Sequence, residues 1–290
     1  MEFLSYLISG ISLGSVYAII ALGYTMVYGI AKMLNFAHGD VIMIGGYISF
    51  CAMSYLNLPG PLALLLAMVV CTALGVIIEG LAYRPLREAT SLAVLITAIG
   101  VSYFLQNSAL LIWGATPKVY SPIIEGTQTV GGLSVSNISL LTMAACIVIM
   151  VVLTLFTSKT KMGKAMRACS EDKGAAQLMG INVNRTISIT FAIGSALAAV
   201  AGVLMCSAYP TLMPTTGSMP GIKAFTAAVF GGIGSIPGAF LGGILLGIIE
   251  ALAKAYISTQ LSNSIVFAVL IIVLLVRPAG LLGKYVPEKV

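Results

Sequence analysis

Two short polar stretches, one in each half of the sequence, lie between apolar runs, and the first holds the single histidine of the chain. Asn35, His38, Gly39 and Asp40 lie close together between two long apolar runs. An imidazole near a carboxylate could relay protons or line a polar path through a membrane. The alternative role is structural, because Asn35 and Asp40 are residue types that cap helices and Gly39 permits a tight turn. The residue types alone leave both roles open.

The second polar stretch ends at Gly221, and Lys223 opens the glycine-rich segment Ile222–Gly234 that follows it. The Lys223 ammonium could meet an anion within the membrane. Alternatively, its long side chain could extend to the water interface. The candidates for a substrate pathway are therefore Asn35, His38, Gly39, Asp40, Gly221 and Lys223.

Two acidic residues, Glu79 and Glu250, lie near the ends of apolar runs. A charged group is costly at the bilayer centre, so we expect both at the membrane interface. Arg84 is close enough in sequence to pair with Glu79. Lys254 follows Glu250 by one helical turn and is its expected partner.

The composition determines what surrounds these residues. The chain has 290 residues, of which 59% are hydrophobic and only 8% are charged, and its mean hydropathy is +1.06. A soluble domain carries about 25% charged residues, which cover its outside. This composition excludes a soluble enzyme, a disordered chain and a disulfide scaffold. It leaves a polytopic membrane protein.

The sequence contains no motif for catalysis. It lacks a GxxxxGK[ST] phosphate loop, an HExxH metal motif and a GxSxG nucleophile motif. Its five cysteines have no metal-ligand spacing. We therefore expect no enzyme activity, no catalytic residue, no metal site and no cofactor in this chain. The net charge of +6 is explained by basic cytoplasmic loops and requires no nucleic-acid partner.

The apolar runs predict an all-α polytopic membrane protein with about eight to nine transmembrane segments, since a helix crosses the bilayer in roughly 20 residues. The eight clear segments are Phe3–Ile30, Val41–Leu58, Pro61–Ala82, Leu92–Trp113, Ser139–Thr157, Thr186–Ala208, Pro237–Ala253 and Ser258–Val276. The ninth, Ile222–Gly234, is too short and too rich in glycine to cross as one regular helix.

Lysine and arginine in the short loops predict the orientation. The segment Lys159–Arg185 is the most basic stretch and is expected in the cytoplasm, whereas Gly114–Ile138 is expected outside. Counting spans back from Arg84 places the N-terminus outside. The basic tail, which includes Lys284 and Lys289, is expected in the cytoplasm. This requires the short ninth segment to cross as a broken helix.

Both halves of the chain follow the same order of a long span, a polar break and a glycine-bearing span. The predicted orientation makes the second copy an inverted repeat of the first. Corresponding interrupted segments indicate a transport pathway, because irregular backbone at membrane depth must be buried or line a cavity. We expect one transmembrane permease domain, residues 1–290, with a first helical half (1–157), a cytoplasmic coupling loop (158–185) and a second helical half (186–290).

The cytoplasmic loop is expected to form two short helices. Met162–Cys169 is basic, and Asp172 is placed to cap a second helix. Gly180 is placed to end that helix in a left-handed conformation. The small residues Ala175 and Ala176 would give it a face that can dock into a groove on a partner. The alternative is an ordinary solvated loop.

Three segments carry a resemblance to a known family. They are Leu34–Asp40 (LNFAHGD), Glu171–Asn182 (EDKGAAQLMGIN) and Phe230–Ala239 (FGGIGSIPGA). They resemble the permease subunits of bacterial branched-chain amino acid ABC importers, in order and at the expected spacing over nearly the whole chain. Without a longer N-terminal extension, the chain resembles the H-type rather than the M-type permease.

The resemblance implies a five-part importer in the bacterial inner membrane. Two permeases would form the pathway, and two cytoplasmic ATPase subunits would bind the ATP. A periplasmic binding protein would deliver leucine, isoleucine or valine. The resemblance implies an ATPase-coupling role for Glu171, Ala175, Ala176 and Gly180, but it assigns no substrate contact. Related members import urea, short amides or other amino acids.

Two other functions remain open. An ion-coupled secondary transporter of a small polar solute would use His38 and Asp40 as a relay, and inverted repeats fit it equally well. The expected coupling loop and an expected lack of buried charge pairs favour the importer. An intramembrane enzyme is the weaker alternative, because no set of nucleophile and base is present.

Overall fold

The structure is a computed structural model, which describes residues 2–87, 89–130 and 133–283. The helices of the first half are α1 (Glu2–Ala31), α2 (His38–Ser54), α3 (Gly60–Ile78), α4 (Ser91–Trp113) and α5 (Asn137–Lys159). Those of the second half are α8 (Val183–Ala208), α9 (Ser218–Gly231), α10 (Ile236–Tyr256) and α11 (Ser262–Val276). α3 continues into a π-helical turn, η1 (Glu79–Tyr83), and a 3-10 turn, η2 (Arg84–Leu86).

Among the described residues, six helices are long and apolar enough to cross a membrane. They are α1, α3 with its continuation to Leu86, α4, α5, α8 and α10. The three other helices of the two halves, α2, α9 and α11, have 17, 14 and 15 residues. A helix of 14 residues is about 21 Å long, which is less than the roughly 30 Å hydrocarbon core of a bilayer. The chain is therefore an all-α polytopic membrane protein, and its polar breaks shorten two of its helices.

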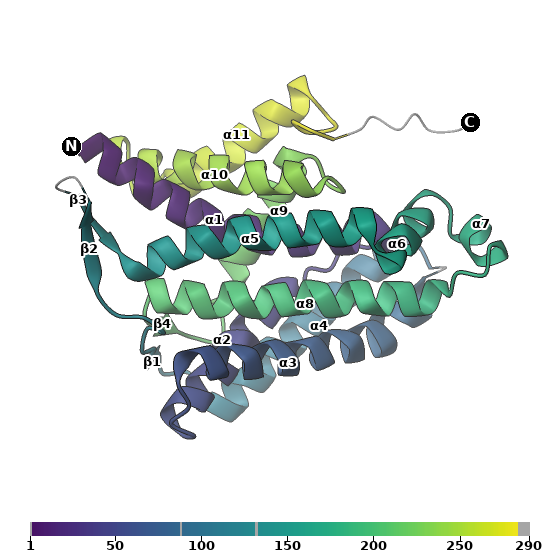
Figure 1. Cartoon of the computed structure of the whole chain (residues 1–290), viewed down its shortest axis with the longest axis horizontal. Coiled ribbons are helices and arrows are strands. Elements are labelled where there is room, and N and C mark those ends of the chain that lie inside the picture. The colour runs from purple at the N-terminus through teal and green to yellow at the C-terminus, as the bar shows by residue number, and fades with distance from the viewer. Residues whose placement is uncertain (1, 88, 131–132, 284–290) are drawn as a thin grey trace.

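The two ends of the bundle differ (Figure 1). The N-terminus lies at one end with two small sheets, which we call the hairpin end. One sheet pairs β1 (Lys118–Val119) with β4 (Thr211–Leu212), and the other is the hairpin of β2 (Thr127–Val130) and β3 (Leu133–Ser136). Sequence patterns did not indicate these strands. The β1–β4 pair ties the loop before α5 to the loop after α8.

The opposite end, which we call the loop end, holds α6 (Lys161–Glu171) and α7 (Lys173–Leu178). The last described residues return to this end, where Leu281 N donates a hydrogen bond to Phe230 O at the end of α9. The chain thus passes from β4 at the hairpin end through α9 to the loop end, as a broken crossing. The predicted tail residues Lys284 and Lys289 lie outside the described residues.

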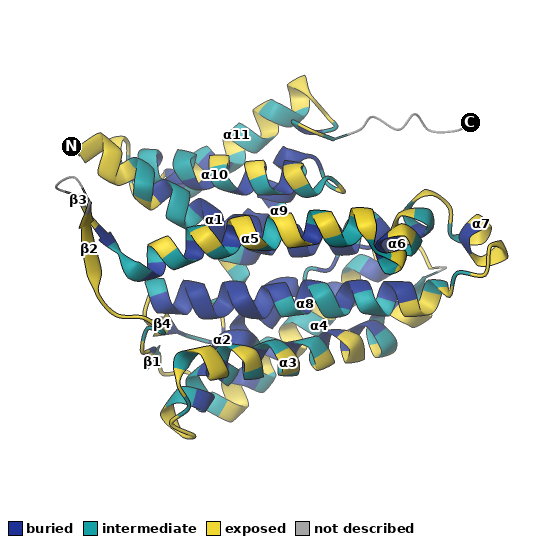
Figure 2. Cartoon of the chain, in the orientation of Figure 1, coloured by how far each residue is buried: buried dark blue, intermediate teal, exposed yellow. Residues whose placement is uncertain are grey.

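The two halves interlock rather than stand side by side. α3 of the first half packs on α8 of the second, and α10 of the second half packs on α1 of the first. Small residues allow these close approaches, since a Cβ atom added at Gly14 of α1 would lie 2.9 Å from Gly243 O of α10. As Figure 2 shows, α8 is buried along most of its length, whereas α3, α4 and α5 carry exposed edges.

Candidate functional site

The two polar breaks bring the N-terminal ends of α2 and α9 together inside the bundle. A Cβ atom added at Gly39 would lie 2.7 Å from Gly217 O, and one added at Gly221 would lie 2.9 Å from Gly39 Cα. Carbon atoms normally approach no closer than about 3.5 Å, so the crossing requires glycine. From this crossing α2 runs toward the hairpin end and α9 toward the loop end (Figure 1). This arrangement matches the expected inverted relation of the two broken segments.

A cleft of about 300 Å³ opens beside this crossing, and we call it the central cleft. Its polar wall includes Asp40 of α2, Gln106 of α4 and Ser218 of α9. The Gln106 amide donates to Asp40 Oδ1 (2.9 Å) and to Ser218 Oγ (3.4 Å). One amide therefore connects the first turns of both broken segments to a third helix. The apolar wall consists of Tyr24, Phe36, Ile99, Tyr103 and Ile222.

The charges around the central cleft suit a small zwitterion. The N-terminal end of a helix carries a partial positive charge, and two such ends meet here. His38 N, Asp40 N and Ser218 N at these ends already donate to carbonyl oxygens of the preceding turns. The Asp40 carboxylate lies in the first turn of α2 and supplies a negative charge beside them. A solute carboxylate can face the helix ends while an ammonium faces Asp40. The aromatic wall can cover an apolar side chain.

The structure divides the predicted pathway residues. Gly39, Asp40 and Gly221 line the central cleft. Asn35 and His38 are buried within the described bundle away from the cleft lining, at 5% and 1% exposure. The predicted pathway set is therefore brought together only in part.

Asn35 and His38 pack against aromatic side chains. Asn35 Oδ1 accepts a hydrogen bond from the Tyr83 hydroxyl (2.8 Å), and Tyr83 lies in the π-helical turn that follows α3. The His38 ring lies beside the Tyr24 ring, with 4.6 Å between centroids, and its edge fills the space that Gly23 leaves open. The Asn35 contact connects the first polar break to the loop end of α3.

The capping role considered for Asn35 and Asp40 is wrong for α2. Its N-cap residue is Ala37, and the described structure gives this cap no side-chain hydrogen bond. The Asp40 carboxylate instead accepts from Gln106. The turn itself is present in the backbone, since His38 N donates to Asn35 O at 3.1 Å.

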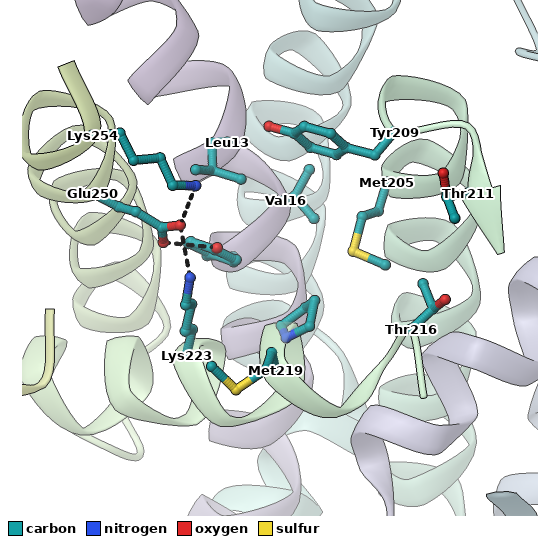
Figure 3. Close-up of a pocket in the computed structure, with 12 residues that line it drawn as sticks. Leu13, Val16, Met205, Tyr209, Thr211, Thr216, Met219, Lys223, Glu250 and Lys254 are labelled. Carbon is teal, nitrogen blue, oxygen red and sulfur yellow. Dashed lines mark hydrogen bonds and ion pairs between the residues drawn. The ribbon is translucent and has the colours of Figure 1, made fainter. Parts of the chain in front are cut away.

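Lys223 belongs to a second cavity, on the other side of α9, with a volume of about 260 Å³. Figure 3 shows Glu250 of α10 between two lysines. Glu250 Oε1 lies 2.7 Å from Lys223 Nζ and 2.6 Å from Lys254 Nζ, and Glu250 Oε2 accepts from the Tyr17 hydroxyl at 2.9 Å. We call Tyr17, Lys223, Glu250 and Lys254 the ion cluster, and the space beside it the ion-cluster cavity.

The structure corrects three expectations about charged residues. Lys223 is only 6% exposed, so the alternative that it extends to water is wrong. Glu250 is fully buried and pairs with Lys223 as well as with the expected Lys254. Glu79 is also buried, and its partners are Arg87 and the Ser188 hydroxyl rather than Arg84. Buried charge pairs therefore exist, and their expected lack cannot favour the importer over an ion-coupled transporter.

The loop between the halves forms the two expected helices, α6 and α7. The Asp172 carboxylate accepts from Ala175 N at 2.9 Å and caps α7. Gly180 has a φ of 81°, which is the left-handed conformation expected after a helix end. Lys173 Nζ donates to Ala31 O at the end of α1 (2.9 Å), and burial together with the nearby Arg87 guanidinium lowers the Lys173 pKa. The loop is thus anchored to the bundle.

The expected small docking face is only partly available. Glu171, Ala175 and Gly180 are exposed, but Ala176 is 4% exposed and packs in a cluster with Met166 and Cys169. Ala176 therefore holds α7 onto α6 and cannot be the contact surface of the loop.

Sequence reasoning missed two groups of residues. Leu178 and Met179, at the tip of α7, are 90% and 83% exposed. Their sequence signal is an apolar pair at the end of a short polar helix. Ser102 and Gln106 line the central cleft, and their signal is a polar pair inside an apolar span. Within the described residues, no three His, Cys, Asp or Glu side chains gather where they could hold a metal ion.

Comparisons with known proteins identify the family of this chain. The family model for the branched-chain amino acid transport system permease component matches residues 6–275. The high-affinity branched-chain amino acid transport system permease protein BraD of Pseudomonas aeruginosa is 47% identical over 302 residues, which cover 100% of this chain and 98% of the relative. LivH of Escherichia coli K12, which carries the same description, is 48% identical over 303 residues with the same coverage.

A more distant relative extends the similarity to archaea. The probable branched-chain amino acid transport permease protein LivH of Methanocaldococcus jannaschii is 31% identical over 235 residues, which cover 78% of this chain and 73% of that one. Among solved structures, PsaBC from Streptococcus pneumoniae in complex with a Fab aligns with 94% of this chain and 90% of that chain, at 16% identity and a TM-score of 0.47. From the family match over residues 6–275 and its near-complete alignment with BraD and with LivH of Escherichia coli, the chain belongs to the family of permease components of branched-chain amino acid transport systems.

Proposed function

We propose that this chain is the H-type permease of an ATP-driven importer of leucine, isoleucine and valine. The observation that carries the proposal is the central cleft, where two broken segments meet beside a carboxylate, an amide and an apolar wall. The cleft combines a place for both charges of an amino acid with a place for an aliphatic side chain. The family and the names of its relatives support the same substrate class.

The proposed importer contains other proteins besides this chain. A second permease would complete the pathway, and two cytoplasmic ATPase subunits would bind ATP, which is why we propose no cofactor and no enzyme activity for this chain. A periplasmic binding protein would deliver the amino acid at the hairpin end. We place the chain as one permease domain in the bacterial inner membrane.

The proposed coupling surface is the tip of α7. Leu178 and Met179 extend from it almost fully exposed, and such apolar side chains favour burial in a groove of a partner. Glu171, Ala175 and Gly180 lie on the exposed part of the same loop. We propose that movement of the ATPase pair is passed through α6 and α7 to the end of α1, where Lys173 contacts Ala31 O.

The test of the proposed function is uptake of labelled leucine into proteoliposomes that contain the complete transporter and its binding protein. Uptake should require ATP on the side of the ATPase. The variant Asp40→Leu should reduce uptake at least tenfold, because it removes the acceptor of the Gln106 amide and the negative charge of the central cleft. Lys118→Leu is the matched control, because Lys118 lies in β1 at the hairpin end and lines neither cavity.

The alternative of an ion-coupled transporter gives the opposite result in that assay. Asp40 is hydrogen-bonded to Gln106, and the His38 ring packs on Tyr24, so the two proposed relay groups face different partners. Uptake that persists without ATP and stops when the proton or sodium gradient is removed would refute the ATP-driven importer. Normal uptake by Asp40→Leu would remove the central cleft from the pathway.

A further inference from the structure

The ion cluster carries more positive than negative charge. Two ammonium groups face one carboxylate, and both carboxylate oxygens have partners, since Oε1 contacts Lys223 and Lys254 and Oε2 accepts from Tyr17. An ammonium has three N–H donors, and the contact with Glu250 uses one donor on each lysine. The cluster therefore retains donors and an excess of one positive charge.

The excess charge lies at a cavity rather than in bulk water. Lys223 and Glu250 are 6% and 0% exposed, and the Lys254 side chain is 39% exposed at the cavity edge. Charge in such a place is poorly solvated, so an anion that enters the cavity is attracted more strongly than it would be at an open surface. A carboxylate beside the two lysines would neutralise the excess.

The remaining walls define the rest of the ligand. Leu13, Val16 and Met205 line the cavity with apolar surface beside the ion cluster (Figure 3). Thr211 lies on the other side of the cavity in the same view, where its hydroxyl can accept from an ammonium group. A volume of about 260 Å³ is below the range of about 300–1,000 Å³ that is usual for drug-sized ligands, so the cavity suits a small solute.

We propose that the ion-cluster cavity is a second binding site for the amino acid, in which Lys223 and Lys254 hold its carboxylate. The proposal rests on the proposed import function and adds a site apart from the central cleft. The cavity includes Thr211 of β4 and therefore reaches toward the hairpin end, where the amino acid would arrive. α9 separates the two cavities, with Lys223 lining one and Gly221 the other. In this proposal the ion cluster binds the solute before it reaches the central cleft.

The test measures the charge of the cavity with a reporter thiol. Met219 lines the cavity and is 43% exposed, so Met219→Cys places a thiol there. The background carries Cys51→Ala, because the other four native cysteines are buried. The complete transporter in nanodiscs is treated with an anionic and with a cationic methanethiosulfonate reagent of similar size, and the two rates are compared.

We expect the anionic reagent to react faster than the cationic one. Lys254→Gln should lower the ratio of anionic to cationic rates on the order of fivefold, because it removes one nearby unit charge. Lys118→Gln, which removes a positive charge at the same end outside the cavity, should leave the ratio unchanged. Leucine at millimolar concentration should slow labelling, whereas leucinamide, which lacks the carboxylate, should not.

The proposal would be overturned if Lys254→Gln left the ratio of anionic to cationic labelling rates unchanged. It would also be overturned if leucine and leucinamide slowed labelling equally, or if neither slowed it. Inorganic phosphate that slowed labelling as strongly as leucine would overturn it as well. Protection that appears only in phosphatidylglycerol nanodiscs and not in phosphatidylcholine nanodiscs would assign the cavity to a lipid headgroup and also overturn it. Uptake of leucine by the wild-type transporter is measured separately. Failure of that uptake would refute the proposed function, but it would not change the measured ratio of anionic to cationic labelling rates.

Discussion

Replacing the charged residues of the ion cluster one at a time should destabilise the protein by unequal amounts. Glu250 contacts both lysines and Tyr17, so Glu250→Leu leaves Lys223 buried without a counter-ion. Breaking a buried pair in this way costs about 3–5 kcal/mol. Lys223→Met leaves Glu250 paired with Lys254 and should cost less. Lys254→Gln removes a half-exposed charge and should cost about 1 kcal/mol or less.

The double variant Lys223→Met/Glu250→Leu distinguishes charge pairing from packing. It removes both buried charges and replaces them with apolar side chains of similar size, an exchange that is often neutral or stabilising. It should therefore be more stable than Glu250→Leu alone. With about 2–4 °C for each kcal/mol, Glu250→Leu should lower the melting temperature by roughly 6–20 °C, and the double variant should recover much of that loss.

The assay is thermal unfolding of the purified protein in detergent, with all four variants measured in the same buffer. The prediction requires the order Glu250→Leu, then Lys223→Met, then Lys254→Gln, from most to least destabilised. A double variant that is less stable than Glu250→Leu would refute the reasoning. That result would mean that the Lys223 ammonium stabilises the bundle through a contact other than Glu250, such as the Tyr17 ring, whose centroid is 5.9 Å away.

Three further predictions address the crossing, the coupling loop and the orientation. Gly221→Ala should lower stability by about 1–3 kcal/mol and slow uptake, because its Cβ would lie 2.9 Å from Gly39 Cα. Gly100 has open space around it, so the control Gly100→Ala should be neutral or stabilising in the same unfolding and uptake assays. Leu178→Glu should leave the melting temperature unchanged but abolish co-purification of the ATPase, since Leu178 is 90% exposed; normal retention would make the loop a solvated connection. A cysteine at Glu171 should react with an impermeant reagent in inverted vesicles only, and reaction in intact spheroplasts would reverse the orientation.

Composition and spacing predicted the membrane fold because lipid imposes simple rules on each segment separately. Long apolar runs must be helices, and a glycine-rich run too short to cross alone must be one part of an interrupted crossing, as α9 is. The loop helices were also local features, with Asp172 as a cap and Gly180 as an end. These elements depend on neighbours within a few residues of the sequence, and their boundaries could be predicted for that reason.

The site could be predicted only in part, because its contacts join distant segments. Asp40 stood out as an acid in an apolar region, but its partner Gln106 lies 66 residues away on α4. Lys254, one helical turn from Glu250, was foreseen as a partner, whereas Lys223, 27 residues away, was not. Ala176 looked like part of an outer face, and the packing of α7 on α6 buries it. Such pairings depend on how helices cross, which spacing in the sequence does not specify.

The interlocking of the two halves has a consequence for biosynthesis. Tyr17 in α1 is bonded to Glu250 in α10, and these residues are 233 positions apart. At a synthesis rate of about 5–20 residues per second, α1 waits roughly 10–50 seconds in the membrane before α10 emerges from the ribosome. During that time the glycine face of α1, which later packs on α10, must be covered by lipid or by an insertion factor. The first half released alone would therefore lack the surface that completes it, and quality-control proteases should remove chains truncated before α10.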